Sequence, residues 1–324
     1  MRGNIHETIG LTDVRPRYDA VVIGAGPAGC GVAACLADRG ASVLLIESNP
    51  NAARRFAGEW IHPEGARVLR EHGLLAGLAN PVKTRGFVVC ANDGLDPIRL
   101  DYPDGHTGFA CEHETLVTHL RQRVKRLPRV EYIEGVRGRA LDADAVELLG
   151  RRGPSKRIVA ERVVVAGGRS ARNADTRGTR RQVPISSMAG LLVTDAELPV
   201  DGFGHVILGG PGPVLAYRID ERRIRLCIDV PRGVGRGPHT PEWIWETFAE
   251  VLPPSLRIGV RNALSREALS WAANAFRPRC YQTASGVALV GDAAGVFHPL
   301  TAMGITMSLL DAEALAAAPS LDAY

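Results

Sequence analysis

The chain has 324 residues, which is enough for one large domain or two ordinary ones. Its composition, with 45% hydrophobic and 23% charged residues, is typical of a soluble globular protein. A formal net charge of +4 is too small to indicate a nucleic-acid partner, so we expect none.

No stretch of about 18 or more uninterrupted apolar residues occurs, so the sequence predicts no integral membrane segment. Residues 1–16 lack the apolar core of a signal peptide and are interpreted as a loose N-terminal tail. The six cysteines form no CxxC pair and no spacing typical of metal ligands. We therefore expect no metal site and a reducing, cytoplasmic location.

A strand, a glycine-rich turn, a helix and a second strand follow one another near the start of the chain. Tyr18–Ile23 is a short apolar, β-branched run typical of a buried parallel strand, and it leads directly into the turn Gly24–Gly29, Gly-Ala-Gly-Pro-Ala-Gly. A helix is expected over Cys30–Arg39. A second apolar strand, Ser42–Ile46, ends on Glu47.

Each glycine of this turn has a separate role. Gly24 permits the tight turn, Gly26 lets backbone amides approach a pyrophosphate, and Gly29 lets the helix pack against the strand. The helix N-terminus favours the negative charge of the phosphates. Glu47 lies about 20 residues further on, where a carboxylate can accept hydrogen bonds from a ribose diol. The unit predicts a dinucleotide site without deciding between FAD and NAD.

The middle of the chain predicts one more helix, one more buried strand and a region of short β-like runs. A basic amphipathic helix is expected over Leu116–Leu127, and its basic face is interpreted as solvated. That face carries Arg121, Arg123, Lys125 and Arg126. The strand Arg162–Ala166 then runs into Gly167. Four β-like runs separated by Gly and Pro turns predict an antiparallel sheet. They are Gly190–Val193, His205–Leu208, Val214–Ile219 and Ile224–Val230.

Near the C-terminus a buried strand again precedes a glycine turn. Val287–Val290 leads into Gly291–Gly295 (GDAAG), and the run Phe297–Gly304 (FHPLTAMG) opens a helix, Ile305–Ala317. These segments resemble the flavin-dependent monooxygenases of the para-hydroxybenzoate hydroxylase fold. In motif wording, HPLTAMGIT and the segment Arg55–Gly65 (RFAGEWIHPEG) are closest to squalene epoxidases and their bacterial relatives.

The resemblance implies FAD as the cofactor, with Asp292 on its ribityl chain, Arg55 (or Arg54, if the register is off by one) in contact with it, and the Pro-to-Gly loop beside its ring. The helix that starts at Ile305 would stabilise negative charge on the reduced flavin. The expected cofactor-binding residues are Gly24, Gly26, Pro27, Ala28, Gly29, Glu47, Ser48, Arg55, Val136, Gly291, Asp292, Pro299, Gly304 and Ile305. No catalytic residue is assigned, and His298 is a candidate proton relay or a loop-packing residue.

The fold implied by the resemblance is α/β, a Rossmann-like FAD-binding domain of the GR2 type with an inserted antiparallel β-sheet substrate domain. The FAD-binding domain is expected to be discontinuous, over residues 17–81, 111–174 and 281–324. The substrate-binding sheet is expected over 82–110 and 175–280. It would face the flavin and form a mostly apolar cleft at the domain interface.

The chain departs from the family in two places. The family has an aspartate after the third strand, with a role in FAD and nicotinamide handling, and this chain has Gly167 there. The family also has further C-terminal helices, which attach squalene epoxidases to membrane. This chain stops at Tyr324, so we expect either a shortened chain or a more open substrate cavity.

The resemblance implies an FAD-dependent monooxygenase, an epoxidase or hydroxylase acting through a flavin C4a-hydroperoxide on an apolar, electron-rich small molecule. Electrons would come from NAD(P)H or a separate flavin reductase. Two alternatives stay open, an FAD-dependent reductase or desaturase of a prenyl chain, similar to geranylgeranyl reductases, and a non-catalytic FAD-binding relative. The triplet Trp243-Ile244-Trp245 does not continue as the Trp-x-Trp-x-Ile-Pro motif of flavin halogenases, so we expect it in a helix, Pro241–Val251.

Overall fold

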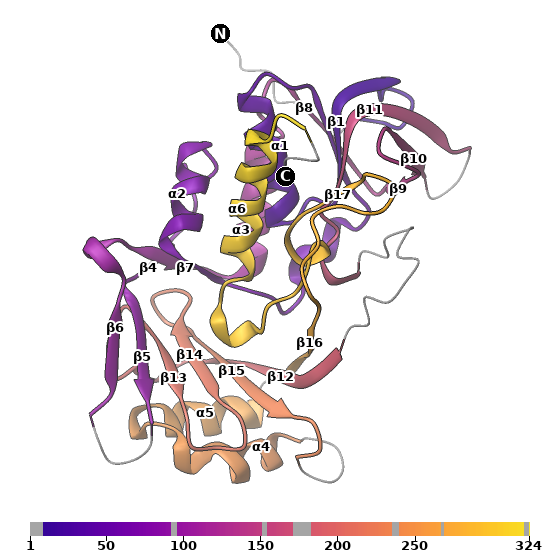
Figure 1. Ribbon diagram of the computed structural model, residues 1–324. Coiled ribbons are helices and arrows are strands. Elements are labelled where there is room, and N and C mark those ends of the chain that lie inside the picture. Colours follow the sequence, from indigo (N-terminus) through magenta and orange to yellow (C-terminus); the bar gives the residue numbers. More distant parts are fainter. Residues whose placement is uncertain are drawn as a thin grey trace.

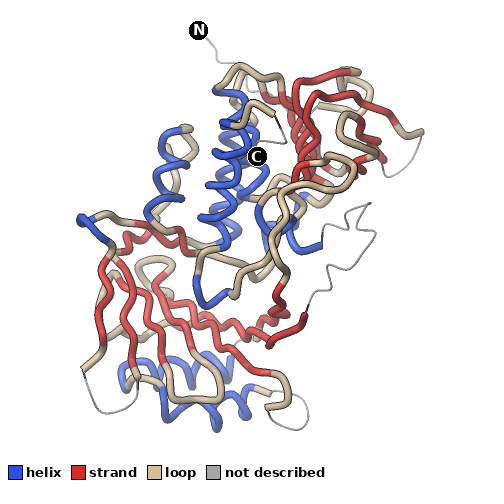
Figure 2. The backbone as a smooth tube through the Cα atoms, in the orientation of Figure 1, coloured by secondary structure: helices blue, strands red, loops and turns tan. Residues whose placement is uncertain are grey.

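The computed structural model describes residues 9–91, 96–150, 154–170, 183–234, 240–266, 269–320 and 324. Two large sheets lie at opposite ends of the molecule, and helix α6 (Gly304–Ala317) points from the first sheet toward the second (Figure 1). Helices cover one side of the first sheet and the outer face of the second (Figure 2). The predicted mixed α/β architecture is confirmed.

The first sheet is built on parallel, buried strands. Its order is β8-β2-β1-β11-β10-β9, and β17 also pairs with β11. The pairs β1–β2, β1–β11, β2–β8 and β11–β17 are parallel, whereas β9 and β10 form an antiparallel hairpin beside the start of β11. The strands are β1 Arg17–Ile23, β2 Val43–Glu47, β8 Val130–Glu134, β9 Arg137–Ala140, β10 Ala145–Leu149, β11 Lys156–Val165 and β17 Ala288–Leu289.

The register brings the carboxyl ends of four parallel strands to one edge. Ile23 pairs with Ile46 and with Val165, and Val165 pairs with Leu289. The segments that follow these strands therefore leave the sheet side by side. In open α/β sheets this edge is where ligands bind.

Four helices are associated with the first sheet and with each other: α1 Pro27–Asp38, α2 Pro63–Glu71, α3 His113–Val124 and α6. Helices α1 and α6 approach closely because Gly31 lies between them. A Cβ atom at Gly31 would lie only 3.0 Å from Leu309 Cδ2 and 3.3 Å from the Ala312 Cβ. The small residues of α1 thus let its buried face share one core with α6.

The second sheet is mainly antiparallel and has the order β16-β12-β15-β14-β13-β5-β6. Only the pair β5–β13 is parallel among the pairs described in this sheet. Its strands are β5 Gly86–Cys90, β6 Ile98–Asp101, β12 Val183–Val193, β13 Phe203–Ile207, β14 Val214–Arg218, β15 Ile224–Pro231 and β16 Ser270–Phe276. Helices α4 Pro241–Phe248 and α5 Pro254–Arg266 cover its outer face (Figure 1).

Alternate residues of β14 enter two different apolar clusters. Val214 and Ala216 pack with α4 and α5 on the outer face. Leu215 and Tyr217 point to the inner face, toward the first sheet and α6. We call the inner cluster the apolar wall. It consists of Phe56, Trp60, Phe87, Ala110, Met188, Leu192, Val206, Leu215, Tyr217, Ile219, Cys227, Leu300 and Ala302.

A small third sheet and several single-turn helices connect these parts. The sheet has the order β3-β7-β4, with β3 Trp60–Ile61, β4 Val82–Thr84 and β7 Gly108–Ala110. The 3-10 helices are η1 Pro50–Arg54, η2 Pro103–Gly105, η3 Gly168–Ser170, η4 Ala249–Val251, η5 Gly291–Ala293 and η6 Pro299–Thr301. The Trp243 triplet lies in α4, and the 3-10 turn η4 follows it directly.

The expected region 82–110 contributes to two sheets, since β5 and β6 join the second sheet and β4 and β7 the small one. The expected boundary between residues 174 and 175 lies outside the described residues. The division of the chain into domains therefore stays a prediction. No helix in the described part of the chain combines the length and apolarity needed to cross a membrane.

The interpretation of residues 1–16 as a loose tail is wrong for its described part. Val14 is only 2% exposed and packs in the core beneath the first sheet. The Ile9 N–H donates to the Tyr132 carbonyl at 3.1 Å, and Lys156 Nζ donates to the Thr12 carbonyl at 3.2 Å. Apolar residues 9, 11 and 14 explain the difference, because they give this segment a face to bury. Residues 1–8 lie outside the described residues.

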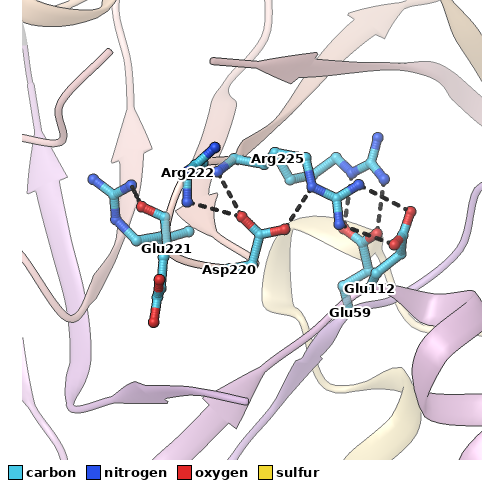
Figure 3. A network of polar contacts seen from close by, with 8 residues as sticks. Glu59, Glu112, Asp220, Glu221, Arg222 and Arg225 are labelled. Carbon is cyan, nitrogen blue, oxygen red and sulfur yellow. Dashed lines mark hydrogen bonds and ion pairs between the residues drawn. The ribbon is translucent and has the colours of Figure 1, made fainter. Parts of the chain in front are cut away.

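A buried ion pair joins the second sheet to the segment before β3. Arg225 of β15 binds Glu59 with two hydrogen bonds, from Nε at 2.8 Å and from Nη2 at 2.7 Å, and the Tyr217 hydroxyl donates to the same carboxylate at 3.2 Å. Glu59 is 1% exposed and Arg225 is 8% exposed. The close-up in Figure 3 shows this pair beside a second, more exposed one, in which Arg223 binds Glu112 and Asp220. Together these pairs fix the β14–β15 hairpin against the segments before β3 and α3.

Breaking one partner of the Glu59–Arg225 pair is expected to cost far more than replacing both. Each of Glu59→Leu and Arg225→Met leaves a buried charge without its partner, which lowers the free energy of unfolding by about 3–5 kcal/mol. The double variant removes both charges and should be much closer to the wild type. Urea denaturation of the four proteins measures the coupling, and additive losses in the double variant would contradict it.

Candidate functional site

A cavity of about 750 Å³ opens at the carboxyl ends of β1, β2 and β11, beside the start of α1. Its volume lies within the range of small-molecule sites. The predicted cofactor residues that line it are Gly24, Gly26, Glu47, Ser48 and Arg55. These residues are therefore brought together in the structure, although their cofactor role stays a prediction.

The glycine turn leaves room for a ligand at one position only. Gly24 has φ +109°, and a Cβ there would lie 2.7 Å from the Ala166 carbonyl oxygen. A Cβ on Gly29 would lie 1.8 Å from the Gly24 carbonyl oxygen, so this contact requires glycine. At Gly26, in contrast, nothing lies within 4 Å of a Cβ position, and the residue lines the cavity. Open space at a helix N-terminus is what a dinucleotide pyrophosphate requires.

Glu47 is buried and organises the nucleotide turn itself. Its Oε2 accepts from the Ala25 N–H at 3.0 Å and from Arg121 Nη2 at 2.8 Å, while Oε1 accepts from the Asn49 N–H at 2.8 Å. The carboxylate still lines the cavity. A ribose there would meet an acid whose orientation is already fixed by three donors.

The interpretation of Arg121 as a solvated residue is wrong. Its side chain is 7% exposed, lines the cavity, and also donates to the Ala25 and Pro50 carbonyls, both at 2.8 Å. The signal was present in the sequence, because Arg121 follows Val117 by four residues and precedes Val124 by three. This spacing places it on the buried face of α3.

His113 is a second cavity residue that the sequence reasoning missed. It is buried at the first position of α3, and its Nδ1 lies 2.8 Å from the Gly58 carbonyl oxygen, to which it donates. Burial is the main cause that lowers the pKa of His113 to about 4, so the ring is uncharged at neutral pH. His113 therefore adds no charge to the four arginines that line the cavity, which are Arg55, Arg121, Arg137 and Arg139.

The other predicted residues do not line this cavity; they are Pro27, Ala28, Gly29, Val136, Gly291, Asp292, Pro299, Gly304 and Ile305. Val136 is buried in the core under the first sheet, and the neighbouring residues Arg137–Ala140 line the cavity instead. Gly167 and Gly168 also line the cavity. A Cβ atom at Gly168 would lie 3.7 Å from Arg55 Nη2.

The second glycine turn lies next to the first. Gly291 has φ +60°, and a Cβ there would lie 3.0 Å from the Ala28 Cβ. Its N–H donates to Asp311 Oδ2 at 2.8 Å. Burial raises the pKa of Asp311, although its ion pair with Arg279 opposes the shift. Asp311 therefore holds the backbone of the Gly291 turn in place by this hydrogen bond.

Asp292 is the exposed acid of this turn. Arg169 Nε donates to its Oδ2 at 3.2 Å, and the side chain is about one third exposed. The Gly304 Cβ position lies 4.0 Å from Asp292 Oδ1, so the turn also adjoins the start of α6. The predicted residues Ala28, Gly291, Asp292 and Gly304 thus form a row that continues from the nucleotide turn toward the second sheet.

The loop before α6, residues His298–Met303, contacts the second sheet through His298. His298 Nδ1 accepts from the Leu300 N–H at 3.3 Å, and Nε2 lies 3.6 Å from Asp229 Oδ2 of β15. Asp229 also accepts from Ser186 and from Asn274 Nδ2, the latter at 2.9 Å. Burial would raise the pKa of Asp229, but these contacts outweigh it and the pKa is lowered. Both ring nitrogens of His298 are therefore engaged, which favours its loop-packing role.

Comparisons with known proteins agree with this arrangement. Residues 164–319 match the family model of squalene epoxidase, and residues 19–99 match that of the FAD dependent oxidoreductases. The squalene monooxygenase of Mus musculus is 29% identical over 306 residues, and that of Eremothecium gossypii is 28% identical over 347. The alignments cover 90% and 92% of this chain but only 53% and 69% of those relatives, so the chain spans little more than half of the mouse protein.

Solved structures show the same fold. The probable FAD-dependent monooxygenase pqsL from Pseudomonas aeruginosa matches with a TM-score of 0.76 and 22% identity, over 94% of this chain and 86% of its own. The p-nitrophenol 4-monooxygenase PnpA from Pseudomonas putida matches with a TM-score of 0.76 and 20% identity, over 93% and 79%. The predicted Rossmann-like FAD-binding fold and the resemblance to squalene epoxidases are confirmed. The family matches also support FAD as the cofactor.

Two glycine substitutions should separate cofactor binding from folding. Gly26→Ala places a methyl group into the open space of the cavity, so FAD affinity should fall by about tenfold or more while the protein stays as stable as the wild type. Gly29→Ala forces an impossible contact with the Gly24 carbonyl and should destabilise the apoprotein by about 1–3 kcal/mol or more. FAD titration and thermal unfolding of the apoproteins measure both effects, and equal behaviour of the two variants would disprove the assignment.

Proposed function

We propose that this chain is an FAD-dependent monooxygenase, an epoxidase or hydroxylase, whose substrate is an apolar, electron-rich small molecule. One observation carries the proposal, the row of residues that runs from Ala28 through Gly291 and Asp292 to Gly304 at the start of α6. The cavity is followed by the Gly291–Asp292 turn and then by the loop before α6. Leu300 and Ala302 of that loop pack into the apolar wall. A flavin held along this row would end where the second sheet offers apolar contacts.

The chemistry of the apolar wall supports an apolar substrate. Its members come from both halves of the chain and include the rings of Phe56, Trp60, Phe87 and Tyr217. Trp60 contacts Phe87 with ring centroids 4.9 Å apart and Tyr217 at 5.6 Å. Aromatic side chains with few polar groups are typical of sites for apolar ligands, where the polar groups set orientation. The squalene named for the relatives is a molecule of this class, and it is a reasonable first probe.

When bound, FAD supplies the electron transfer and the activation of dioxygen. The chain's own residues would hold and orient it. The amides at the start of α1 and the Arg55 guanidinium would bind the pyrophosphate, and Asp292 would accept from the ribityl hydroxyls. The N-terminus of α6 would place a partial positive charge beside the ring. The Glu59–Arg225 pair would keep the second sheet closed over the site, which limits access of water.

The proposed reaction is tested by following oxygen atoms. Protein reduced without air and then mixed with ¹⁸O₂ and squalene or another polyprene should give a product that carries one ¹⁸O atom. Gly26→Ala is the matched control, since it should fold but bind FAD poorly. Substrate-dependent flavin oxidation without ¹⁸O in the product would instead indicate a prenyl reductase or desaturase. Failure of every donor to reduce the flavin would indicate a non-catalytic relative.

We expect the choice of electron donor, NAD(P)H or a separate flavin reductase, to depend on the residue type at position 167. Gly167 lines the cavity where the family's aspartate would stand, and a glycine has no side chain to orient a nicotinamide. The positive φ of this turn lies at the next residue, Gly168 with +67°, so a side chain at 167 meets no left-handed backbone.

We therefore expect slow flavin reduction by NADPH alone and faster reduction by a separate reductase. Gly167→Asp should raise the NADPH reduction rate, because misplacement of a reactant by about 1 Å can cost on the order of a hundredfold. Gly167→Ala controls for the change in backbone freedom. Stopped-flow absorbance measures the three rates, and fast reduction of the wild type would refute the idea.

A further inference from the structure

A series of hydrogen bonds through three aromatic side chains connects β3 to the loop before α6. The Trp60 Nε1–H lies 3.0 Å from the Tyr102 hydroxyl oxygen, and this oxygen lies 2.7 Å from His62 Nδ1. The other ring nitrogen, His62 Nε2, lies 3.2 Å from the Thr301 carbonyl oxygen. The rings also contact one another, with His62 and Tyr102 centroids 5.6 Å apart. The proposed function uses Trp60 only as an apolar ring and assigns no role to these hydrogen bonds.

The chemistry at the two ends of this series fixes the direction of every bond. A carbonyl can only accept, so His62 Nε2 carries the proton and donates to Thr301. In the neutral ring Nδ1 is then an acceptor, and the Tyr102 hydroxyl must donate to it. An indole can only donate, so the Tyr102 oxygen accepts from Trp60. All three rings are thus satisfied by one arrangement.

Burial favours the uncharged form of both inner groups. Burial lowers the pKa of His62, and hydrogen bonds to the carbonyls of Thr301 and Ala302 only partly oppose this. Burial likewise raises the pKa of Tyr102 to about 12, and the bond from Trp60 opposes it. The other groups that face His62 are the Phe87 ring and the Thr306 hydroxyl, and neither titrates.

His62 makes hydrogen bonds on both sides of the turn at Ala302, one to α6 and one to the loop before it. Its backbone N–H donates to Thr306 Oγ1 at 3.0 Å, and Thr306 is 1% exposed. Its ring donates to Thr301 on the other side of the turn. Between them lies Ala302, a residue with a Cβ at φ +52°, a conformation that favours glycine. The turn has its own bond from the Ala302 N–H to the Pro299 carbonyl at 2.9 Å, and His62 restrains it from outside on both sides.

We propose that His62 is a positioning residue, held in its Nε2-protonated tautomer by Trp60 and Tyr102, which fixes residues 302–305 in the place where α6 meets the flavin. The inference rests on the proposed flavin site. Gly304 and Ile305, whose amides begin α6, lie inside the restrained segment. Loss of the bond to Thr301 would let the turn relax at Ala302 and move these amides away from the ring.

The tautomer is tested first, without cofactor or turnover. In ¹⁵N-histidine-labelled apoprotein, the signals absent from His62→Gln identify His62. We expect a protonated Nε2 and an unprotonated Nδ1 that persist below the usual titration range of histidine. In Tyr102→Phe the Nδ1 signal should shift, because its donor is lost. A protonated Nδ1 in the wild type would overturn the proposal.

The positioning role is tested by FAD affinity and the visible spectrum of the bound flavin, neither of which depends on oxygenation. Gln can donate to Thr301 and accept from Tyr102, so His62→Gln should stay close to the wild type. His62→Leu leaves the Thr301 carbonyl without this donor and should weaken FAD binding about tenfold with a changed spectrum. Ala302→Gly in the His62→Leu background should restore part of the loss, since glycine adopts the turn without restraint.

Unfolding midpoints of the apoproteins serve as the control. If His62→Leu does not fold, Tyr102→Phe replaces it, with the same expected change in spectrum and the same rescue by Ala302→Gly. Wild-type affinity and spectrum in the folded Leu variant would refute the proposal while leaving the monooxygenase assignment intact. A loss of FAD affinity in His62→Leu that Ala302→Gly fails to reduce would also refute the proposal. His62 would then act on the stability of the protein alone.

Discussion

The arrangement of the site depends on the buried ion pair between Glu59 and Arg225. The Glu59 side chain belongs to the segment 55–62, whose other residues reach three different surroundings. Arg55 lines the nucleotide cavity, Phe56 and Trp60 belong to the apolar wall, and His62 bonds to the loop before α6. Because Glu59 is tied to β15, a displacement of the second sheet would move all three contacts together. One short segment thus connects the cavity with the apolar wall and the loop before α6.

The βαβ unit at the start of the chain could be predicted because its constraints are local. Gly29 must approach the Gly24 carbonyl oxygen within one turn, so this part of the spacing is local, whereas Gly24 itself packs against Ala166 far along the chain. The second sheet was also predictable, since the short β-like runs that form β13, β14 and β15 are separated by Gly and Pro turns. The strands β5, β6 and β16 were not predicted individually, and the parallel pair of β5 with β13 depends on a partner far along the chain.

Several site residues could not be predicted from the sequence for the same reason. The partners Glu59 and Arg225 lie 166 residues apart, and His62 and Thr301 lie 239 apart. No periodicity or spacing rule links such positions, since only the folded chain brings them together. Arg121 is a different case, because its spacing from Val117 and Val124 in the sequence already predicts a place on the buried face of α3. A charged residue on a buried helix face is itself a sign of a functional partner.

The alternation of β14 side chains between two apolar clusters affects how the sequence of such a protein can vary during evolution. Val214 and Ala216 secure the second sheet to α4 and α5, while Leu215 and Tyr217 face the apolar wall. Side chains that hold the sheet to its helices and side chains of the apolar wall are therefore separate sets on one strand, although Tyr217 of the second set also donates to Glu59. Natural variation can exchange the second set while the first keeps the sheet intact. A scaffold of this kind can diverge in ligand preference in small steps without passing through unstable intermediates.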